Sequence, residues 1–365
     1  MKSHLLELYK LLIERFFRVR TLGAWLLKGG LSLLVILLGA GIAGRLDLRF
    51  GDFKLNVQGS TGEGLPELII YIAFAVAISL ILAGGLFMWR DERRERRKLL
   101  IVVEVRGLHS SPDAPAKDVI NPAFRGHRHS VLVDFRPNLA GELVSPELML
   151  AKIKGMEFNV QSAAQGRDMS DVSVAIGGVA AVPGMFYIGM RMDDESRFEL
   201  FDWDRDLKCW KTIDRLDDGN RPLPLSIPAF SSAVTEVVLA VSASYVVSDE
   251  AVASSFPGLP VVAFAAEKVQ ANSYWSEEVQ RAFAAEFRNA VQELLSRSIK
   301  RIHLVLAAPA SLTARLGATY DERLHPEMIV YQYERSSTPP YPWGILLPHH
   351  GAPEPSVLQT PAAVG

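Results

Sequence analysis

The stretch from Leu68 to Trp89 carries no charged side chain, and it limits what this chain can fold into more than any other feature. A helix of about 20 apolar residues is long enough to cross the ~30 Å hydrocarbon core of a bilayer. The strongly charged segment RDERRERRK, Arg90 to Lys98, follows at once. The sequence therefore predicts a transmembrane helix that leads into a basic juxtamembrane segment.

A second hydrophobic block precedes this one. Gly29 to Gly44 is uncharged, and Thr21 to Gly44 spans the bilayer if Lys28 extends its ammonium group to the interface. A cleaved signal peptide is the alternative, but a long charged lead precedes the block and another block lies close behind it. The single cysteine, Cys209, also leaves no internal disulfide of the kind found in exported proteins. We predict a two-helix transmembrane hairpin within residues 22–98.

Residues 1–21 mix leucine, isoleucine and phenylalanine with five basic side chains, which predicts an amphipathic N-terminal helix. A helix of this composition can lie on an anionic membrane surface. An ordinary cytoplasmic helix that leads into the first span is the alternative.

Basic residues are unevenly distributed around the two predicted spans. Residues 1–20 contain five Lys or Arg and Arg90 to Lys98 contain six, whereas the link from Arg45 to Gly64 contains three. Under the positive-inside rule, both termini then lie in the cytoplasm and the link lies outside. Within the link, Leu46, Leu48 and Phe50 alternate with charged residues, which predicts a small hairpin.

Small residues four apart stripe both predicted spans, as in Gly39 with Ala43, Ala40 with Gly44, and Ala73 with Ala77. This spacing lets helix backbones approach closely in a membrane. It fits contacts between neighbouring hairpins and packing within one hairpin equally well.

From Leu99 onward the composition becomes that of a soluble α/β protein. Short apolar runs predict strands, and Ser145 and Ser276 are placed to cap two amphipathic helices. Alternating strands and helices favour a mainly parallel sheet with helices on both faces. The predicted strands are Leu99–Val105, Val131–Phe135, Val172–Ile176, Phe198–Trp203, Val237–Val241, Val261–Phe264, Ile302–Ala308 and Ile329–Tyr333.

The order strand, loop, strand, helix, strand, short helix, strand occurs twice, in halves 99–231 and 232–348. In each half a proline opens the short helix, as suits the first helical position, and a glycine suited to the left-handed end of a helix closes it. The shared marks are Pro183, Gly189, Arg205 and Trp210 in the first half and Pro309, Gly317, Arg335 and Trp343 in the second. This order indicates a divergent duplication, with chance similarity between two α/β units as the alternative. The Pro- and Ala-rich tail, 349–365, is predicted to be disordered.

The second half ends with a more specific pattern. Ala308 to Leu312, Leu316-Gly317, Ile329 to Glu334 and Pro342 to Leu346 resemble the ending of the SAVED domain. The segment VAAVPGMFYIGM…FDWDRDLKCW resembles that family's first half, and the resemblance covers about Leu99 to Pro348. It implies two fused Rossmann-like halves, similar to CRISPR-associated (CARF) sensor domains, that bind cyclic oligonucleotides made by a bacterial anti-phage signalling enzyme.

The two predicted spans extend the resemblance to SAVED effectors with two transmembrane helices, from cyclic-oligonucleotide-based anti-phage systems (CBASS). For such an effector, the resemblance implies a place in the bacterial inner membrane. It also implies membrane disruption after infection, which kills the cell before the phage matures.

Three stretches are expected to form the ligand site, because ligands of open parallel sheets bind beyond the carboxyl ends of the strands. A cyclic oligonucleotide needs hydrogen-bond donors for phosphate, aromatic faces for bases, and positive charge. The predicted ligand-binding residues are Ser242, Ser244, Pro309, Ala310 and Ser311 around the donors, Tyr245, Tyr274 and Trp275 for stacking, and Lys268 or Arg315 for charge. The alternative for each is structural, since loop serines cap helices and aromatic residues before a helix often pack in a core.

Other chemistries have little support in the sequence. The net charge of −2 gives no bulk attraction to nucleic acid, so we expect no DNA partner. His127 and His129 share a strand face, but no further ligand at metal-binding spacing accompanies them. No nucleophile elbow, P-loop or dinucleotide fingerprint is present, so we expect no catalytic residue, metal or cofactor.

The sequence and the resemblance together predict a membrane-anchored receptor for a cyclic di- or trinucleotide, with membrane lipid and further copies of itself as partners. Ligand binding must change how the hairpins associate, and head-to-tail assembly of an asymmetric sensor would do this because such contacts propagate. The alternative from another class is a membrane-tethered nucleotide-processing enzyme, such as a ring nuclease or hydrolase on the same scaffold.

Overall fold

The computed structural model describes residues 21–40, 46–50, 53–57, 67–137, 139, 142–192, 198–229, 231 and 233–360. The chain divides into two compact units, Met1–Arg97 and Lys98–Gly365, one residue from the predicted boundary between hairpin and sensor. Apart from its last residue, the predicted amphipathic helix of residues 1–21 lies outside the described residues.

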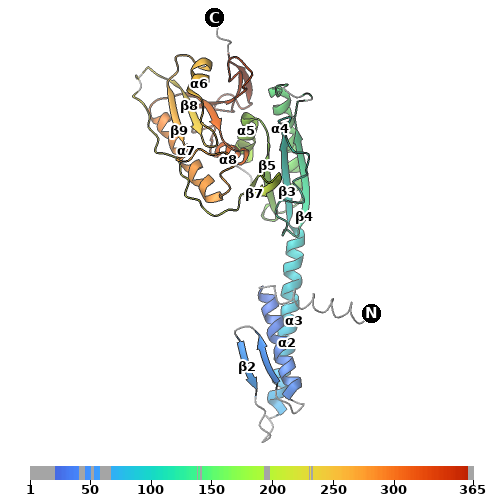
Figure 1. The fold of residues 1–365 in the computed structure, drawn as a ribbon. Coiled ribbons are helices and arrows are strands. Elements are labelled where there is room, and N and C mark those ends of the chain that lie inside the picture. Colours follow the sequence, from blue (N-terminus) through green and yellow to red (C-terminus); the bar gives the residue numbers. More distant parts are fainter. Residues whose placement is uncertain are drawn as a thin grey trace. The chain divides into compact units, whose positions relative to one another are not determined.

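Two antiparallel helices, α2 (Leu22–Ala40) and α3 (Glu67–Arg97), form the described core of the first unit (Figure 1). Their backbones approach closely because Gly23 faces the carbonyl oxygen of Gly84 and Gly30 faces that of Ala77. A Cβ on either glycine would stand only 2.9 or 2.8 Å from these oxygens. Ala77 is itself fully buried, so at this position the small-residue stripe serves packing within the hairpin.

The predicted spans differ in length. By length and composition α3 could cross a membrane over Tyr71–Arg97, whereas the apolar part of the described α2, Leu22–Leu37, is shorter. Between the helices, β1 (Leu46–Phe50) and β2 (Phe53–Val57) pair antiparallel, which confirms the predicted hairpin in the link.

The first half of the second unit is a five-stranded sheet in the order β4-β3-β5-β6-β7, parallel except for β7. Every residue of its strand β3 is buried, as expected for a strand covered on both faces. Its elements are β3 (Leu99–Arg106), β4 (His127–Asp134), α4 (Pro146–Ala164), η1 (Met169–Asp171), β5 (Val172–Val179), α5 (Val182–Met192), β6 (Phe198–Asp204) and β7 (Cys209–Thr212).

The second half is a six-stranded sheet in the order β13-β12-β11-β10-β8-β9, with β12 and β13 antiparallel. Its elements are β8 (Glu236–Ser242), α6 (Asp249–Ser255), β9 (Val261–Ala265), α7 (Glu277–Ser296), β10 (Arg301–Ala307), α8 (Ala310–Gly317), β11 (Glu327–Gln332), β12 (Trp343–Leu346) and β13 (Ser356–Gln359). The prediction of a disordered tail is wrong for Ser356–Gln359, because pairing with β12 satisfies its backbone groups. This half therefore extends past Pro348.

Each predicted strand is present, with shifts at the ends. The largest shift is at β4, which begins at His127 rather than Val131 because its first four residues are polar and mostly exposed, so no apolar run marks them. The two predicted helix caps are confirmed. Ser145 Oγ accepts a hydrogen bond from Leu148 N at 3.3 Å, and Ser276 Oγ accepts one from Val279 N at 3.5 Å.

One continuous hydrophobic core joins the two halves. It runs from the inner face of the first sheet through α4, α5, α8 and α7 to the inner face of the second. Helix α6 packs on the outer face of the second sheet. On the outer face of the first sheet, the described cover is a loop that contains Ala116 and Ile120, so the expected second helical layer does not occur there.

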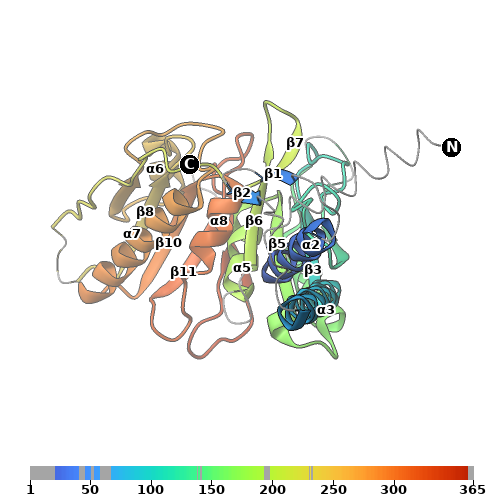
Figure 2. The same ribbon diagram turned by 90° about the horizontal axis from the view of Figure 1, so that it is seen from below.

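Helices α5 and α8 lie side by side between the two sheets (Figure 2). Gly189 of α5 faces the carbonyl oxygen of Ala314, and Gly317 of α8 faces that of Phe186, so any Cβ at either glycine would clash with backbone. Gly317 remains helical and Gly189 lies inside α5, so their predicted role as left-handed helix ends is wrong. Pro309 is likewise the N-cap of α8 rather than its first residue.

Candidate ligand pocket

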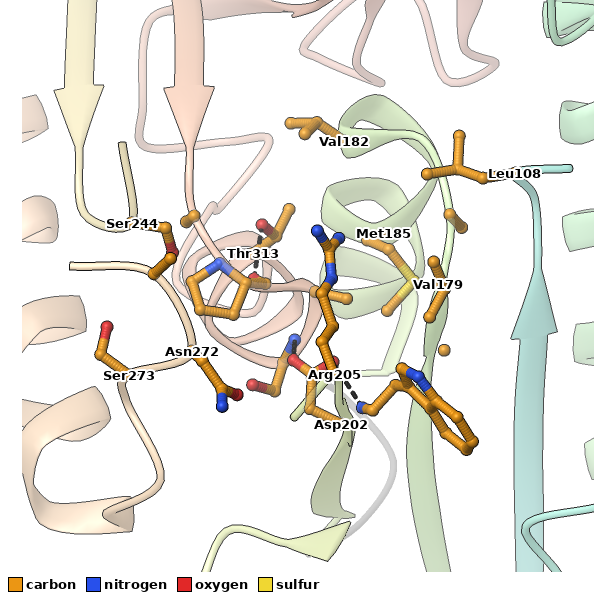
Figure 3. Close-up of a pocket in the computed structure, with 18 of the residues that line it drawn as sticks. Leu108, Val179, Val182, Met185, Asp202, Arg205, Ser244, Asn272, Ser273 and Thr313 are labelled. Carbon is orange, nitrogen blue, oxygen red and sulfur yellow. Dashed lines mark hydrogen bonds between the residues drawn. The ribbon is translucent and has the colours of Figure 1, made fainter. Parts of the chain in front are cut away.

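A pocket opens where the carboxyl ends of strands from both sheets meet. It encloses about 280 Å³, near the lower end of the range for small-molecule sites. The first half contributes the ends of β5 and β6, and the second contributes the loops after β8 and β9 and the start of α8. Figure 3 shows these two sets of residues on opposite sides of the pocket.

Arg205 brings positive charge to this pocket. It follows the end of β6, and its side chain is exposed. Figure 3 shows it extending past Asp202 toward the first turns of α5 and α8. Within the described residues no hydrogen bond or ion pair engages its guanidinium group. Because that group offers five donors in a geometry that matches phosphate, Arg205 is equipped to bind an anion.

A buried carboxylate occupies the start of α8. Ser311 N donates to Asp202 Oδ2 at 2.9 Å, and Trp203 N donates to Asp202 Oδ1 at 2.8 Å. Burial raises the pKa of Asp202, and the hydrogen bonds from Ser311 and Trp203 oppose that rise. A phosphate would have to compete with this carboxylate for the same N–H groups. The geometry therefore argues against the predicted use of Ala310-Ser311 as phosphate donors.

The second half repeats this arrangement with a neutral side chain. Gln332, the last residue of β11, accepts a hydrogen bond at its Oε1 from Val182 N, the first residue of α5, at 3.0 Å. Each sheet thus supplies a side chain that caps the short helix of the other half. Since only Asp202 is a carboxylate, the starts of α5 and α8 differ in electrostatic character.

The loop from Asn272 to Trp275 forms one wall of the pocket in a strained backbone conformation. Asn272 and Tyr274 have φ angles of +51° and +68°, which cost a non-glycine residue on the order of 1 kcal/mol or more. Contacts with the first half hold the loop in place. Asn272 Nδ2 donates to Asp204 Oδ1 at 3.2 Å, and Arg215 N donates to the carbonyl oxygen of Trp275 at 2.9 Å.

Two aromatic rings remain accessible in the pocket. Tyr245 is 57% exposed, and Trp203 is half-buried with its ring against Trp210 at a centroid distance of 5.1 Å. Both residues line the pocket, one from each half. They are the rings on which a base could stack.

The other two predicted stacking residues, Trp275 and Tyr274, are buried and pack against other side chains. Trp275 is 6% exposed, and Lys211 Nζ and Arg215 Cζ lie 5.1 and 5.9 Å from its ring centroid. Tyr274 is buried against Phe283, and burial raises its pKa. Both residues belong to the hydrophobic core, and of the two only Trp275 also lines the pocket.

The structure brings six of the predicted residues to the pocket and leaves four outside it. Those that line it are Ser244, Tyr245, Trp275, Pro309, Ala310 and Ser311. Tyr274, Ser242, Lys268 and Arg315 lie outside the lining. Ser242 Oγ accepts a hydrogen bond from Val247 N, and Lys268 is exposed. Arg315 is in the last turn of α8, where its Nε donates to Gln280 Oε1.

The sequence-based site missed the contribution of the first half. Asp202 and Trp203 end the predicted strand Phe198–Trp203 and Arg205 follows it, whereas every predicted ligand-binding residue belongs to the second half. Ser244 and Tyr245 were located by the rule that ligands bind beyond the carboxyl ends of parallel strands. The same rule applies to β6, so it also predicts a contribution from Asp202, Trp203 and Arg205.

Within the described ranges, no three His, Cys, Asp or Glu side chains are grouped so as to hold a metal ion. His127 and His129 are both exposed on β4. Cys209 lies on β7 with a free thiol.

Two family models match this chain. The model described as the SMODS-associated and fused to various effectors sensor domain (SAVED) matches residues 158–347, more than half of the chain. The model described as the SAVED-fused 2TM effector domain matches residues 2–150. No curated protein matches the chain in sequence.

Solved structures similar to this chain include receptors with SAVED/CARF domains. The Acinetobacter baumannii Cap4 receptor with the cyclic trinucleotide 2'3'3'-cAAA has 11% identity and a TM-score of 0.44, over 74% of this chain and 56% of that one. The same receptor with 3'3'3'-cAAA has 11% identity and a TM-score of 0.44, over 74% of this chain and 57% of that one. The Moraxella osloensis Cap4 receptor has 12% identity and a TM-score of 0.43, over 74% of this chain and 56% of that one. The chain thus spans a little over half the length of these receptors.

Proposed function

Because the chain belongs to the SAVED family, with its sensor domain fused to a 2TM effector domain, we propose that it is a membrane-anchored receptor for a cyclic oligonucleotide. The ligand binds between the two halves of the second unit and leaves unchanged. Binding makes receptors self-associate, and their hairpins disrupt the bacterial inner membrane. The infected cell then dies before the phage matures.

The observation that carries this proposal is the composition of the pocket that both halves build. Arg205 offers an unengaged guanidinium group for a phosphodiester, and Trp203 and Tyr245 offer ring faces for bases. Ser244 and Asn272 add a hydroxyl and an amide. A ligand with several phosphates and several bases uses all of these groups together.

Binding to the full-length protein in detergent tests the proposal. Titration calorimetry with cyclic di- and trinucleotides should show binding that Arg205→Met weakens about 10- to 100-fold, because a charge-assisted hydrogen bond contributes roughly 1.5–3 kcal/mol. Arg335→Met is the matched control, since Arg335 is also exposed and follows a strand but does not line the pocket. Equal affinities of both variants and the wild type would show that the pocket is wrongly assigned.

Recovery of the ligand separates a receptor from the alternative enzyme. The ligand is incubated with the protein and then analysed by chromatography. A receptor returns it intact, whereas a ring nuclease or hydrolase returns a linear or smaller product at a rate proportional to protein concentration.

Both termini lie in the cytoplasm in this proposal, and the link between α2 and α3 lies outside. The support is the excess of basic residues on the flanks over those in the link. A cysteine placed at Ser60 in a Cys209→Ser background should react with an impermeant reagent in intact cells. Reaction only after lysis would reverse the topology.

Self-association is the step that connects ligand to membrane. A ligand shifts an assembly equilibrium only if it binds the assembled state more tightly. The two halves present different surfaces, so contacts between copies would be head-to-tail and would propagate. Ligand should therefore increase light scattering by the detergent-solubilised protein and release dye from vesicles that contain it. Dye release without any growth in particle size would replace assembly with gating of a preformed oligomer.

The two halves are Rossmann-like units that arose by duplication in this proposal. Support comes from the repeated strand order, β4-β3-β5-β6-β7 in one half and β9-β8-β10-β11-β12 in the other. In both, the short helix lies between the third and fourth strands of the sequence, α5 in one half and α8 in the other.

A further inference from the structure

The last two turns of α3 present an arginine face that the proposed ligand pocket does not involve. Helix α3 runs unbroken from Glu67 to Arg97, so the segment after Trp89 continues the helix of the predicted span. All residues from Arg90 to Arg97 are exposed except Glu95, which is half-buried. This charged end of the helix is therefore open to whatever surrounds the membrane-proximal part of the protein.

The arginines in this segment differ in what they contact. Arg96 Nε donates to Glu92 Oε1 at 3.0 Å, and Arg93 Cζ lies 4.1 Å from the ring centroid of Trp89. Arg90 and Arg94 are one turn apart, so they share a side of the helix. Across the part of the chain that the structure describes, neither has a hydrogen bond, ion pair or ring contact.

Aromatic side chains mark the level at which Arg90 and Arg94 meet a bilayer. Trp89 is 54% exposed, and Trp25 of α2 is 67% exposed near the same end of the hairpin, where Gly23 packs against Gly84. Such residues collect at the headgroup level. Tyr71, 70% exposed, lies toward the other end of α3, about 27 Å from Trp89 at 1.5 Å per residue. Since this matches a ~30 Å core, the arginine face falls in a headgroup layer.

We propose that the face formed by Arg90 and Arg94 binds the phosphate groups of anionic phospholipids. Guanidinium groups bind phosphate through two parallel hydrogen bonds, and a helix spacing of one turn lets both engage one headgroup. The cytoplasmic leaflet carries the negative lipids that complement this charge. The inference rests on insertion of the hairpin into a membrane and not on any ligand in the pocket.

Tryptophan quenching in vesicles tests this with the full-length protein. The protein is reconstituted in phosphatidylcholine that contains brominated phosphatidylglycerol, or brominated phosphatidylcholine as the reference. Trp25 and Trp89 are the two tryptophans of the first unit and report the lipid beside the hairpin. We expect the wild type to prefer phosphatidylglycerol by about 5- to 20-fold and Arg90→Gln/Arg94→Gln to lose most of that preference.

The matched control removes the same net charge elsewhere. Arg96→Gln/Arg281→Gln replaces two arginines that are already paired, Arg96 with Glu92 and Arg281 with Glu277, and should keep the preference. Equal losses in both double variants would overturn the proposal, because net charge rather than this face would then select the lipid. Absence of any preference in the wild type would overturn it too.

Two further measurements keep the test decisive. Excess inorganic phosphate should leave the quenching unchanged, whereas displacement of the lipid would assign the face to a soluble anion instead. If the glutamine variant fails to insert, Arg90→Lys/Arg94→Lys retains both charges but not the two-bond geometry, and we expect an intermediate preference. An unchanged preference in the lysine variant would exclude phosphate recognition by the guanidinium groups.

Discussion

The two halves of the second unit share a strand order but bring different chemistry to their common pocket. The end of β6 in the first half supplies charges, Asp202, Arg205 and Asp206. The loops of the second half supply a hydroxyl and a ring, Ser244 and Tyr245, together with amides. The difference shows that sheet order is fixed by core packing, whereas loops beyond the strand ends are free to specialise. The following predictions test which features the halves must share and which can differ.

The largest effect is expected where the halves must match, at the contact between α5 and α8. Gly189→Val puts a side chain against the backbone of Ala314, which cannot move aside, so we expect a loss of more than ~3 kcal/mol and little folded protein. Gly155→Ala in α4 is the control, because an added Cβ meets nothing within 4 Å there. It should stabilise the helix by about 1 kcal/mol. Circular dichroism during heating measures both, and similar melting of the two variants would contradict the close approach.

A smaller effect is expected where the halves differ, at their reciprocal helix caps. Asp202→Ala leaves Ser311 N and Trp203 N unpaired and should lower the free energy of unfolding by about 2 kcal/mol. Gln332→Ala removes one bond to Val182 N and should cost about 1 kcal/mol. Denaturant unfolding measures both, and a larger cost for Gln332→Ala would reverse their ranking.

The same pair predicts a pH dependence. Because the folded protein holds the pKa of Asp202 above its unfolded value, ionisation of this carboxyl costs the folded state free energy. The contribution of Asp202 to stability is therefore largest below the unfolded pKa, about 3.8, and it declines as the pH rises through the folded pKa. Asp202→Asn should remove this decline, whereas Gln332→Ala should leave it unchanged.

Acid should weaken the second half through a group that β5 of the first half lacks. His303 on β10 lies 3.0 Å from Tyr331 Oη and 3.1 Å from Glu236 Oε2, and burial lowers its pKa. Its neutral form favours folding, so its contribution is present above the unfolded pKa of 6.5 and is lost as the pH falls below it toward the folded value. Wild-type protein should therefore become less stable as the pH falls from about 7 to 5.

His303→Gln should flatten most of this loss. Part of the slope will remain, because burial also lowers the pKa of His325. An unchanged slope in His303→Gln would show that acid acts elsewhere.

The smallest effect distinguishes two nearby serines, Ser242 at the end of β8 and Ser244 in the loop that follows. Ser244 lines the pocket, so Ser244→Ala should weaken ligand binding about 3- to 10-fold, the value of one hydrogen bond. Ser242 instead accepts a hydrogen bond from Val247 N at 3.0 Å, so Ser242→Ala should lower stability by about 1 kcal/mol and leave affinity unchanged. Calorimetric binding and thermal unfolding of both variants separate the two roles. The opposite result, with weaker binding in Ser242→Ala and lower stability in Ser244→Ala, would show that the pocket is wrongly placed.

The strands and caps of this fold could be predicted from sequence because burial imposes a local pattern on them. Leu99–Val105 and Ser276 are recognisable from their immediate neighbours alone. The roles of Gly189 and Gly317 could not be recognised from their neighbours in the sequence. A left-handed turn and a close contact between helices both select glycine, and only the tertiary structure shows which of the two applies. Edge pairing by Ser356–Gln359 likewise depends on a partner strand elsewhere in the chain.

The location of the pocket could be predicted from the sequence better than the residues that line it and the hydrogen bonds they make. The expectation that ligands bind beyond the carboxyl ends of the strands correctly placed Ser244 and Tyr245 beside the start of α8. It could not show that Asp202 already occupies the N–H of Ser311, because that bond joins residues far apart in the chain. Arg315 was a reasonable source of charge by position, but helix geometry places it in the last turn, away from the pocket.

The contact between α5 and α8 has the form that two identical subunits make across a two-fold axis. In such an isologous interface, residue i of one subunit meets residue j of the other, and j meets i. Gly189 meets Ala314 and Gly317 meets Phe186, each contacted residue lying three before the other glycine. Within one chain, however, a substitution occurs once rather than twice. Asp202 and Gln332 are therefore free to differ, and the charged residues that line the pocket come from the first half alone, an asymmetry that a symmetric dimer cannot hold.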